Sequence, residues 1–339
     1  MFPLISQPVL SLLASLTLAV GIGPDTLEAV DLYGLRTLAE AVVRATVGLA
    51  AGDPVPDSLE RIRQRLLDLP EVAAVDVSIV CCGEMGGSIL YVGIREEGMA
   101  PIAFRAAPAG AIRLRDAIVE LGARFEGALL AAVRRGATGE DDSQGYALSS
   151  DSVVRSVQKA FLEVARTDFD TLVAVVRSSS DAAHRALAAQ VLAYGAERQA
   201  VVRALVHAVG DPSESVRNNA ARALALVAGW ASKNPQAGLS IPTEPFVDFL
   251  NSVSWTDRNK GVLVLIPLTA ERDSTVLAEL RKRALPSLVE MGRWSNPGHA
   301  LGPYILLARL GGVEDGEAFR AWQAGERETI ITRALEASP

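Results

Sequence analysis

The spacing of hydrophobic residues divides the chain into three parts. Residues 3–22 form an apolar run without a charged side chain, and the first basic residue is Arg36. Residues 27–94 mix runs in which apolar and polar positions alternate, as in a strand, with runs of helical spacing. From about residue 100 onward, apolar residues recur at helical spacing. The pattern predicts an apolar leader, a small α/β part and a long helical part.

The α/β part shows a regular order of predicted elements. Gly34 ends the first strand, the turn Gly52-Asp53-Pro54 separates two helices, and Pro70 ends the second helix. Thr37 is followed three residues later by Glu40, which fits a capping box at the start of the first helix. The expected elements are a strand over 27–35, helices over 37–50 and 57–69, and strands over 72–80 and 88–94. This β-α-α-β-β order predicts two helices on one face of a three-stranded sheet.

The helical part repeats itself. Residues 200–229 have the pattern of a helix, an Asp-Pro turn and a second helix. An offset of 32 residues aligns Arg185 with Arg217, and an offset of 41 residues aligns Arg217 with Arg258. Helix pairs are expected over 171–195, 200–229, 246–268 and 284–312, with single helices before them over 111–136 and 150–166. Stacking of such pairs builds one continuous core, which predicts an α-solenoid.

The fold class is therefore mainly α: an α-solenoid of helix pairs preceded by a small α/β domain. Polar, Gly- and Ser-containing residues at 137–150 predict a linker. Pro267 and Pro303 fall inside expected helices, so the last two pairs either kink there or form a divergent cap. The expected parts are a signal peptide or anchor (1–23), the α/β domain (24–99), a connecting helix and linker (100–150) and the repeat domain (151–335).

Several residues of the α/β part resemble a known family. The run 30–37, the turn at 52–54 and the sequence Leu69-Pro70-Glu71-Val72 are similar to those of a POTRA domain. The resemblance covers about 70 residues of the chain. It implies a module outside the inner membrane that docks a peptide or partner by adding a strand to a sheet edge. No alternating barrel strands follow in the sequence, so it implies docking rather than outer-membrane insertion.

The clearest repeat unit resembles a second family. Asp211-Pro212, Val216-Arg217 and the run 220–224 are similar to HEAT repeats, including the bacterial form found in lyases that handle phycobilin chromophores. The resemblance implies a HEAT-like solenoid whose second helices form a concave binding surface. It also implies an alternative function, a HEAT-like lyase or other enzyme that handles a chromophore or cofactor.

The amino-terminal segment bears on the compartment. The run from Val9 to Val20 has the length of a signal-peptide core, and small residues at 19–21 fit a cleavage site. A retained membrane anchor and a buried helix of a cytosolic domain are the alternatives. Export is the working hypothesis, to the periplasm or cell envelope, with anchoring to the inner membrane if residues 1–23 are retained.

The two cysteines, Cys81 and Cys82, are adjacent. In a strand their side chains point to opposite faces, which favours two structural thiols, and a vicinal disulfide is the alternative in an oxidising compartment. A metal site is not expected, because His184, His207 and His299 lie far apart without ligand spacing.

Composition narrows the function further. The net charge of −7 argues against a nucleic-acid-binding surface, which needs a basic excess. No phosphate loop, nucleophile elbow or paired catalytic carboxylates occur, so no catalytic or cofactor-binding residue is predicted. His184 is expected to be solvated, and His207 is expected to finish the edge of an apolar stripe. Arg217 is read as a contact between neighbouring repeats or, alternatively, as a ligand contact.

The leading hypothesis is a non-enzymatic, exported interaction or scaffold protein whose protein partner is unknown. We expect the partner to contact Asn218, Asn219 and Arg222, exposed on a helix whose other side holds Val216 and Ala220. A cytosolic DNA-handling repeat protein is a third hypothesis, which the acidic balance disfavours.

Overall fold

The computed structural model describes residue 23, residues 25–81 and residues 83–337. The described chain forms two compact units, one of residues 104–242 and one that combines residues up to 103 with residues 243–337. The fold is mainly α, with paired helices preceded by a small α/β domain, as predicted. Among the described residues, no helix combines the length and apolar character needed to span a bilayer.

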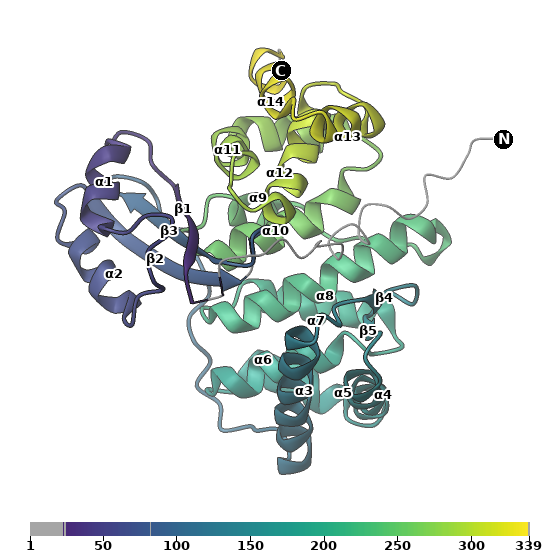
Figure 1. The fold of residues 1–339 in the computed structure, drawn as a ribbon. Helices are drawn as coiled ribbons and strands as arrows, with labels where there is room; N and C mark the ends of the chain where they lie inside the picture. The colour runs from purple at the N-terminus through teal and green to yellow at the C-terminus, as the bar shows by residue number, and fades with distance from the viewer. Residues whose placement is uncertain (1–22, 24, 82, 338–339) are drawn as a thin grey trace. The chain divides into compact units, whose positions relative to one another are not determined.

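The α/β domain has the predicted β-α-α-β-β order. Its elements are β1 (Leu27–Tyr33), α1 (Glu40–Val47), α2 (Leu59–Leu67), β2 (Val72–Cys81) and β3 (Ser88–Glu96). The sheet order is β1-β3-β2, with β3 parallel to β1 and antiparallel to β2. Leu90, Val92 and Ile94 of the central strand pack under α1 and α2 in one apolar core. Figure 1 shows both helices on this face of the sheet.

The second face of the sheet is covered by the C-terminal helices of the same unit. These are α9 (Glu244–Phe249), α10 (Trp255–Leu268), α11 (Ser274–Gly292), α12 (Pro297–Leu310), α13 (Asp315–Gln323) and α14 (Arg327–Glu336). Tyr91 of β3 packs against Trp255 and Trp294, with ring centroids 5.3 and 5.0 Å apart. Gly93 allows the closest approach, since a Cβ there would lie 2.1 Å from the carbonyl oxygen of Val253.

This packing divides the expected repeat domain into two parts, with the division after residue 242. The sequence pattern placed residues 151–335 in one repeat domain, whereas the structure groups residues 243–337 with the sheet. The reason is that β3 is buried on both faces, and Tyr91 on its second face packs against Trp255 and Trp294 of the C-terminal segment. Helices α10 and α12 also continue through Pro267 and Pro303.

Two carboxylates of the sheet bind the N-terminal ends of C-terminal helices. Asp31 accepts hydrogen bonds from the backbone N–H (2.8 Å) and the hydroxyl (2.7 Å) of Ser295, just before α12. Asp76 accepts the N–H of Trp255 at 3.3 Å, at the start of α10. Burial raises the pKa of Asp31, and the hydrogen bonds from Ser295 oppose that rise. The exposed N–H groups of a helix start favour such anionic partners.

The loop between β1 and α1 corrects the predicted capping box. Helix α1 begins at Glu40, and its N-cap residue, Ala39, makes no side-chain cap. Thr37 instead donates both its N–H and its hydroxyl to Glu96, which also accepts the N–H groups of Arg36 and Leu38. Burial alone raises the pKa of Glu96, but these hydrogen bonds outweigh it and lower the pKa to about 2. A distant carboxylate thus replaced the local cap.

The other unit contains the clearest repeats. Its elements are α3 (Asp116–Arg134), β4 (Glu140–Asp141), β5 (Leu148–Ser149), α4 (Ser152–Thr167), α5 (Phe169–Ser178), α6 (Ala182–Leu192), α7 (Arg198–Val209), α8 (Glu214–Lys233) and the 3₁₀ turn η2 (Pro235–Ala237). The pairs α5–α6 and α7–α8 correspond to the predicted pairs 171–195 and 200–229. Helix α3 starts later than expected, because residues 104–115 run in an extended path along the turns of these pairs.

A buried arginine recurs at the start of the second helix of three pairs. Arg185, Arg217 and Arg258 each donate to the carbonyl of the residue six positions earlier, in the turn between the paired helices. Arg185 also forms a bidentate ion pair with Asp211 of the next pair, in which Nε and Nη2 donate to the two carboxylate oxygens at 2.7 and 2.8 Å. The contact between neighbouring repeats is thus made by Arg185, whereas Arg217 donates to the carbonyls of Asp211 and Pro212 in the turn of its own pair. In the last pair the 41-residue offset places His299 at this position.

The ion pair between Arg185 and Asp211 should contribute strongly to stability, because both side chains are almost fully buried. We expect Asp211→Ala to lower the free energy of unfolding by about 3–5 kcal/mol, since it leaves a buried guanidinium without its counter-charge. Urea unfolding followed by circular dichroism measures the change. The exposed pair of Arg166 and Glu163 is the control, and Glu163→Gln should leave the urea midpoint nearly unchanged, because solvent screens the pair. Equal effects of the two substitutions would contradict this role.

His299 makes stability depend on pH. Its Nδ1 lies 2.8 Å from the Tyr91 hydroxyl, and burial, then the charge of Lys260, lowers its pKa from 6.5 to about 4. The unfolded chain therefore binds the proton more readily, and stability should fall as the pH drops from about 6.5 to about 4, by on the order of 3 kcal/mol. Trp255 and Trp294 lie beside this cluster, so tryptophan fluorescence in urea titrations reports it. His299→Gln should reduce the slope of the profile in this range, with the remaining slope due in part to His207, whose pKa is also lowered to about 4; an unchanged slope would contradict the assignment.

Candidate partner-binding groove

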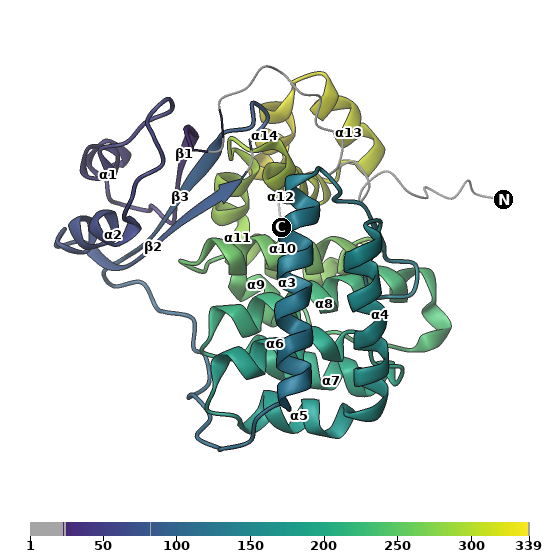
Figure 2. The same ribbon diagram turned by 60° about the horizontal axis from the view of Figure 1, so that its bottom comes forward.

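Helix α3 lies across the second helices of the two repeats in its unit, as Figure 2 shows. Its buried face includes Ile118 and Phe125, and Phe125 contacts the Phe161 ring of α4. At Gly122 the helix comes so close to α6 that a Cβ would lie 2.8 Å from the terminal carbons of Leu187. The second-helix face is therefore partly covered by the chain itself.

The predicted linker at 137–150 is a hairpin packed on the repeats. Its strands β4 and β5 pair antiparallel, and the backbone carbonyl of Ala147 accepts a hydrogen bond from the Tyr194 hydroxyl at 3.1 Å. Arg198 donates to the carbonyl of Gln144 at 2.7 Å, and Gly145 lies against the Trp230 side chain. The segment is therefore more than a simple linker, because Tyr194 after α6, Arg198 of α7 and Trp230 of α8 contact it.

A groove of about 410 Å³ lies between α3, the hairpin, α4, α6 and α8. About half of its lining side chains are apolar, and the others carry hydroxyls, amides and one pair of opposite charges. The lining residues are Phe125, Leu129, Val133, Ala137, Thr138, Glu140, Ala147, Ser149, Gln158, Gln190, Ala193, Tyr194, Asn219, Arg222, Ala223 and Leu226. The deepest residues are almost fully buried, whereas Val133 at the rim is 50% exposed. The volume and lining are typical of sites that bind apolar groups.

Two of the three predicted partner-binding residues line this groove. Asn219 donates to the backbone carbonyl of Ala186 at 3.0 Å, and Asn218 donates to the side chain of Asn219 without lining the groove. Arg222 is 45% exposed and binds both carboxylate oxygens of Glu140 through one nitrogen, Nη2, at 2.6 Å. The sequence placed these residues on one helix face, but it did not indicate that the chain already engages each of them.

Two histidines hold the extended segment 104–115. The Nδ1 atom of His184 accepts the backbone N–H of Leu114 at 2.9 Å, which corrects the expectation that this side chain is solvated. The ring of His207 contacts the Arg105 guanidinium, and burial, then the charge of Arg105, lowers the pKa of His207 to about 4. Arg217 stacks its guanidinium 3.8 Å from the ring centroid of Phe104. These contacts bind a segment of the same chain.

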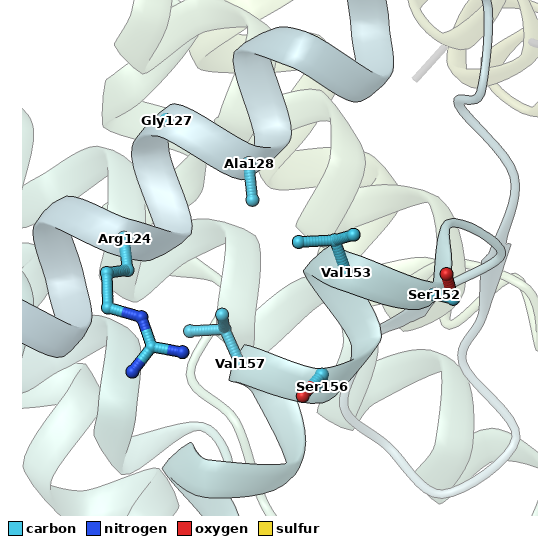
Figure 3. A pocket seen from close by; sticks show the side chains of 7 residues that line it. All are labelled: Arg124, Gly127, Ala128, Ser152, Val153, Ser156 and Val157. Carbon is cyan, nitrogen blue, oxygen red and sulfur yellow. The ribbon is translucent and has the colours of Figure 1, made fainter.

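A second depression, of about 530 Å³, lies between α3 and α4. Figure 3 shows Ala128, Val153 and Val157 pointing into it, with the Arg124 side chain along one side. Its walls are short side chains, and Val153 is 58% exposed, so it encloses little of a ligand. The N–H groups at the adjacent start of α4 are already bound by Asp151. The groove between α3, α6 and α8 is therefore the stronger candidate site.

The structure describes Cys81 but neither Cys82 nor the amino-terminal segment. Cys81 ends β2, but Cys82 lies outside the described residues, so the choice between two thiols and a vicinal disulfide stays a prediction. Within the described ranges, no group of three or more potential ligand side chains is arranged to hold a metal ion. Residues 1–22 lie outside the described residues as well, and the predicted signal or anchor belongs to them.

Comparison with known families supports the repeat assignment. Residues 169–238, which include both helix pairs of this unit, match the family model of HEAT repeats. These helix pairs are HEAT-like. No curated protein matches the chain.

Several solved structures also match. One is a designed armadillo repeat protein with 18% identity and a TM-score of 0.36, over 58% of this chain and 92% of that chain. Another is an engineered protein with 19% identity and a TM-score of 0.37, over 55% and 91%. A third comprises computationally designed armadillo repeat proteins for modular peptide recognition, with 20% identity and a TM-score of 0.35, over 58% and 98%.

The sequence pattern did not predict that residues outside α8 line this groove. Phe125 and Leu129 lie in the expected helix over 111–136, and Glu140 lies in the expected linker over 137–150. One signal was present: Tyr146 interrupts an otherwise polar segment in a chain with only 5% aromatic residues. An aromatic residue in such a segment indicates packing, and Tyr146 does stack near Tyr194, with ring centroids 5.3 Å apart.

Proposed function

We propose that this protein is a non-enzymatic interaction protein that binds an extended segment of a protein partner in the groove between α3, α6 and α8. One observation carries the proposal: the second-helix face of the HEAT-like pairs keeps an apolar groove of about 410 Å³ after the chain's own segments have packed on it. A soluble domain rarely leaves a concave apolar surface without a ligand or partner.

The floor of the groove is shaped for side chains rather than for a reaction. Phe125, Ala193 and Ala223 are buried and present carbon to the groove. The amide of Gln158 is engaged, because its oxygen accepts the N–H of Ser149 at 2.7 Å. Apolar side chains of a partner would displace water here, which is the main source of affinity in such sites.

The α/β domain supplies a second docking element in this proposal. Strand β2 pairs with β3 along one edge, and no strand among the described residues pairs with its other edge. Over ten residues its only charged side chain is Asp76. A long edge strand with few charges can accept an added strand, which agrees with the docking mode implied by the POTRA resemblance.

Occupancy of the groove can be tested by filling it. Ala223 is 3% exposed and lines the groove, so Ala223→Leu should place three extra carbons in the space and weaken partner binding about tenfold. A photo-crosslinker at Leu226, on the groove rim, reports the partner in cells, and mass spectrometry identifies it. Ala225→Leu on the same helix is the matched control, because Ala225 does not line the groove. A crosslinked product that both variants preserve would place the partner elsewhere.

The proposal includes export to the periplasm or cell envelope, which rests on the uncharged apolar run at residues 3–22. Fractionation of cells with a C-terminal epitope tag should place the protein outside the cytoplasm. A variant without residues 1–23 should stay in the cytoplasm. Cytoplasmic recovery of the full chain would contradict export. If the tagged chain sediments with membranes and keeps its full mass, the segment acts as an anchor rather than as a cleaved signal.

A further inference from the structure

One ion pair bridges the rim of the groove. Arg222 and Glu140 are the only charged residues among those that line it in the described chain. Their side chains are 45% and 32% exposed, so both remain within reach of a ligand. A pair this exposed contributes little net free energy, because water and salt compete with it. The groove therefore carries no net charge, and its two opposite charges are held together only by a weak contact.

The two partners of this ion pair are held differently. Arg222 lies on α8 between buried residues of the repeat core, including Ala221 and Ala223. Glu140 lies on β4, a two-residue strand that pairs only with β5 among the described residues. Strand β5 is the anchored strand of the hairpin, since Ser149 donates to Gln158 of α4. The cation is thus part of the rigid wall, and the carboxylate belongs to the outer strand.

Arg222 also keeps unused donors. Both contacts with Glu140 go through Nη2, and in the described structure Nε and Nη1 donate no hydrogen bond. A guanidinium binds a carboxylate best through two parallel N–H groups. The contact with Glu140 does not use that arrangement, so a second carboxylate that approaches from the groove can form a better-aligned pair.

We infer that the partner segment presents an acidic side chain between apolar residues, and that its carboxylate takes Arg222 from Glu140. This inference rests on the proposed function, in which the groove is the binding site. The apolar side chains on either side of the carboxylate would contact Leu129 and Leu226, which line the same groove. Glu140 then acts as an intramolecular competitor that occupies Arg222 when the partner is absent.

The two halves of the ion pair should affect binding with opposite signs. Arg222→Gln removes the cation that the partner needs and should weaken binding about tenfold. Glu140→Gln removes the competitor and should strengthen binding about threefold. If the ion pair serves only to hold the hairpin, both substitutions break the same contact and shift affinity in the same direction.

The probe is a library of random peptides displayed on phage, selected on the purified full chain. Wild-type protein should enrich peptides that carry Asp or Glu between Leu, Val or Phe, and fluorescence anisotropy with the synthetic peptides gives the affinities. Raising the salt concentration should weaken wild-type binding more than binding to Arg222→Gln. Thermal melts check that both variants fold.

The outcomes separate the two levels of the proposal. Selected peptides whose binding is lost in Ala223→Leu but that lack acidic residues, or are rich in Lys and Arg, would overturn the inference and leave the groove as the binding site. Equal weakening by Glu140→Gln and Arg222→Gln would also overturn it. Failure of Ala223→Leu to weaken any selected peptide would instead overturn the proposed function.

Discussion

A buried guanidinium must find hydrogen-bond acceptors for its donors, and this requirement organises the helix pairs. Arg185, Arg217 and Arg258 start the second helix of their pairs, and each bonds the carbonyl of the turn that precedes it. Leaving such a charge without partners costs several kcal/mol. The turn between the paired helices is therefore held in one conformation, and in the first pair it is also tied to its neighbour through Asp211.

The turns between paired helices also form hydrogen bonds with other segments of the chain. In one unit the turns accept and donate backbone hydrogen bonds to the extended segment around Arg105 and Gly110. In the other unit the turns before α10 and α12 meet the sheet, where Asp31 and Asp76 accept N–H groups from helix starts. Both units show the same requirement, because helix ends leave backbone groups without partners in the helix: carbonyls at the ends of α5 and α7 in one unit, and N–H groups at helix starts in the other. The chain satisfies them with its own segments.

The second-helix face is used differently. Helix α3 and the hairpin cover part of it, and the groove that remains has an apolar floor and one exposed ion pair at its rim. Apolar surface supplies binding free energy without direction, whereas a guanidinium selects a planar anion. The combination is suited to a partner segment that is mostly apolar with one acidic position. The three histidines of the chain do not line the groove, and each is bound to an internal partner.

The sequence by itself determined the order of the elements and the repeat. Helical spacing, the Asp-Pro turn and the Gly and Pro punctuation act over a few residues, so the β-α-α-β-β order and the HEAT-like pairs could be predicted from local pattern. It also placed Asn219 and Arg222 on one helix face. Only the tertiary structure decided that Glu140, 82 residues away, occupies Arg222, that Glu96 replaces the Thr37 cap, and that Asp31 binds Ser295 across 264 residues. Such contacts depend on which surfaces pack together after the helices have formed. The spacing of residues along the chain does not determine that packing.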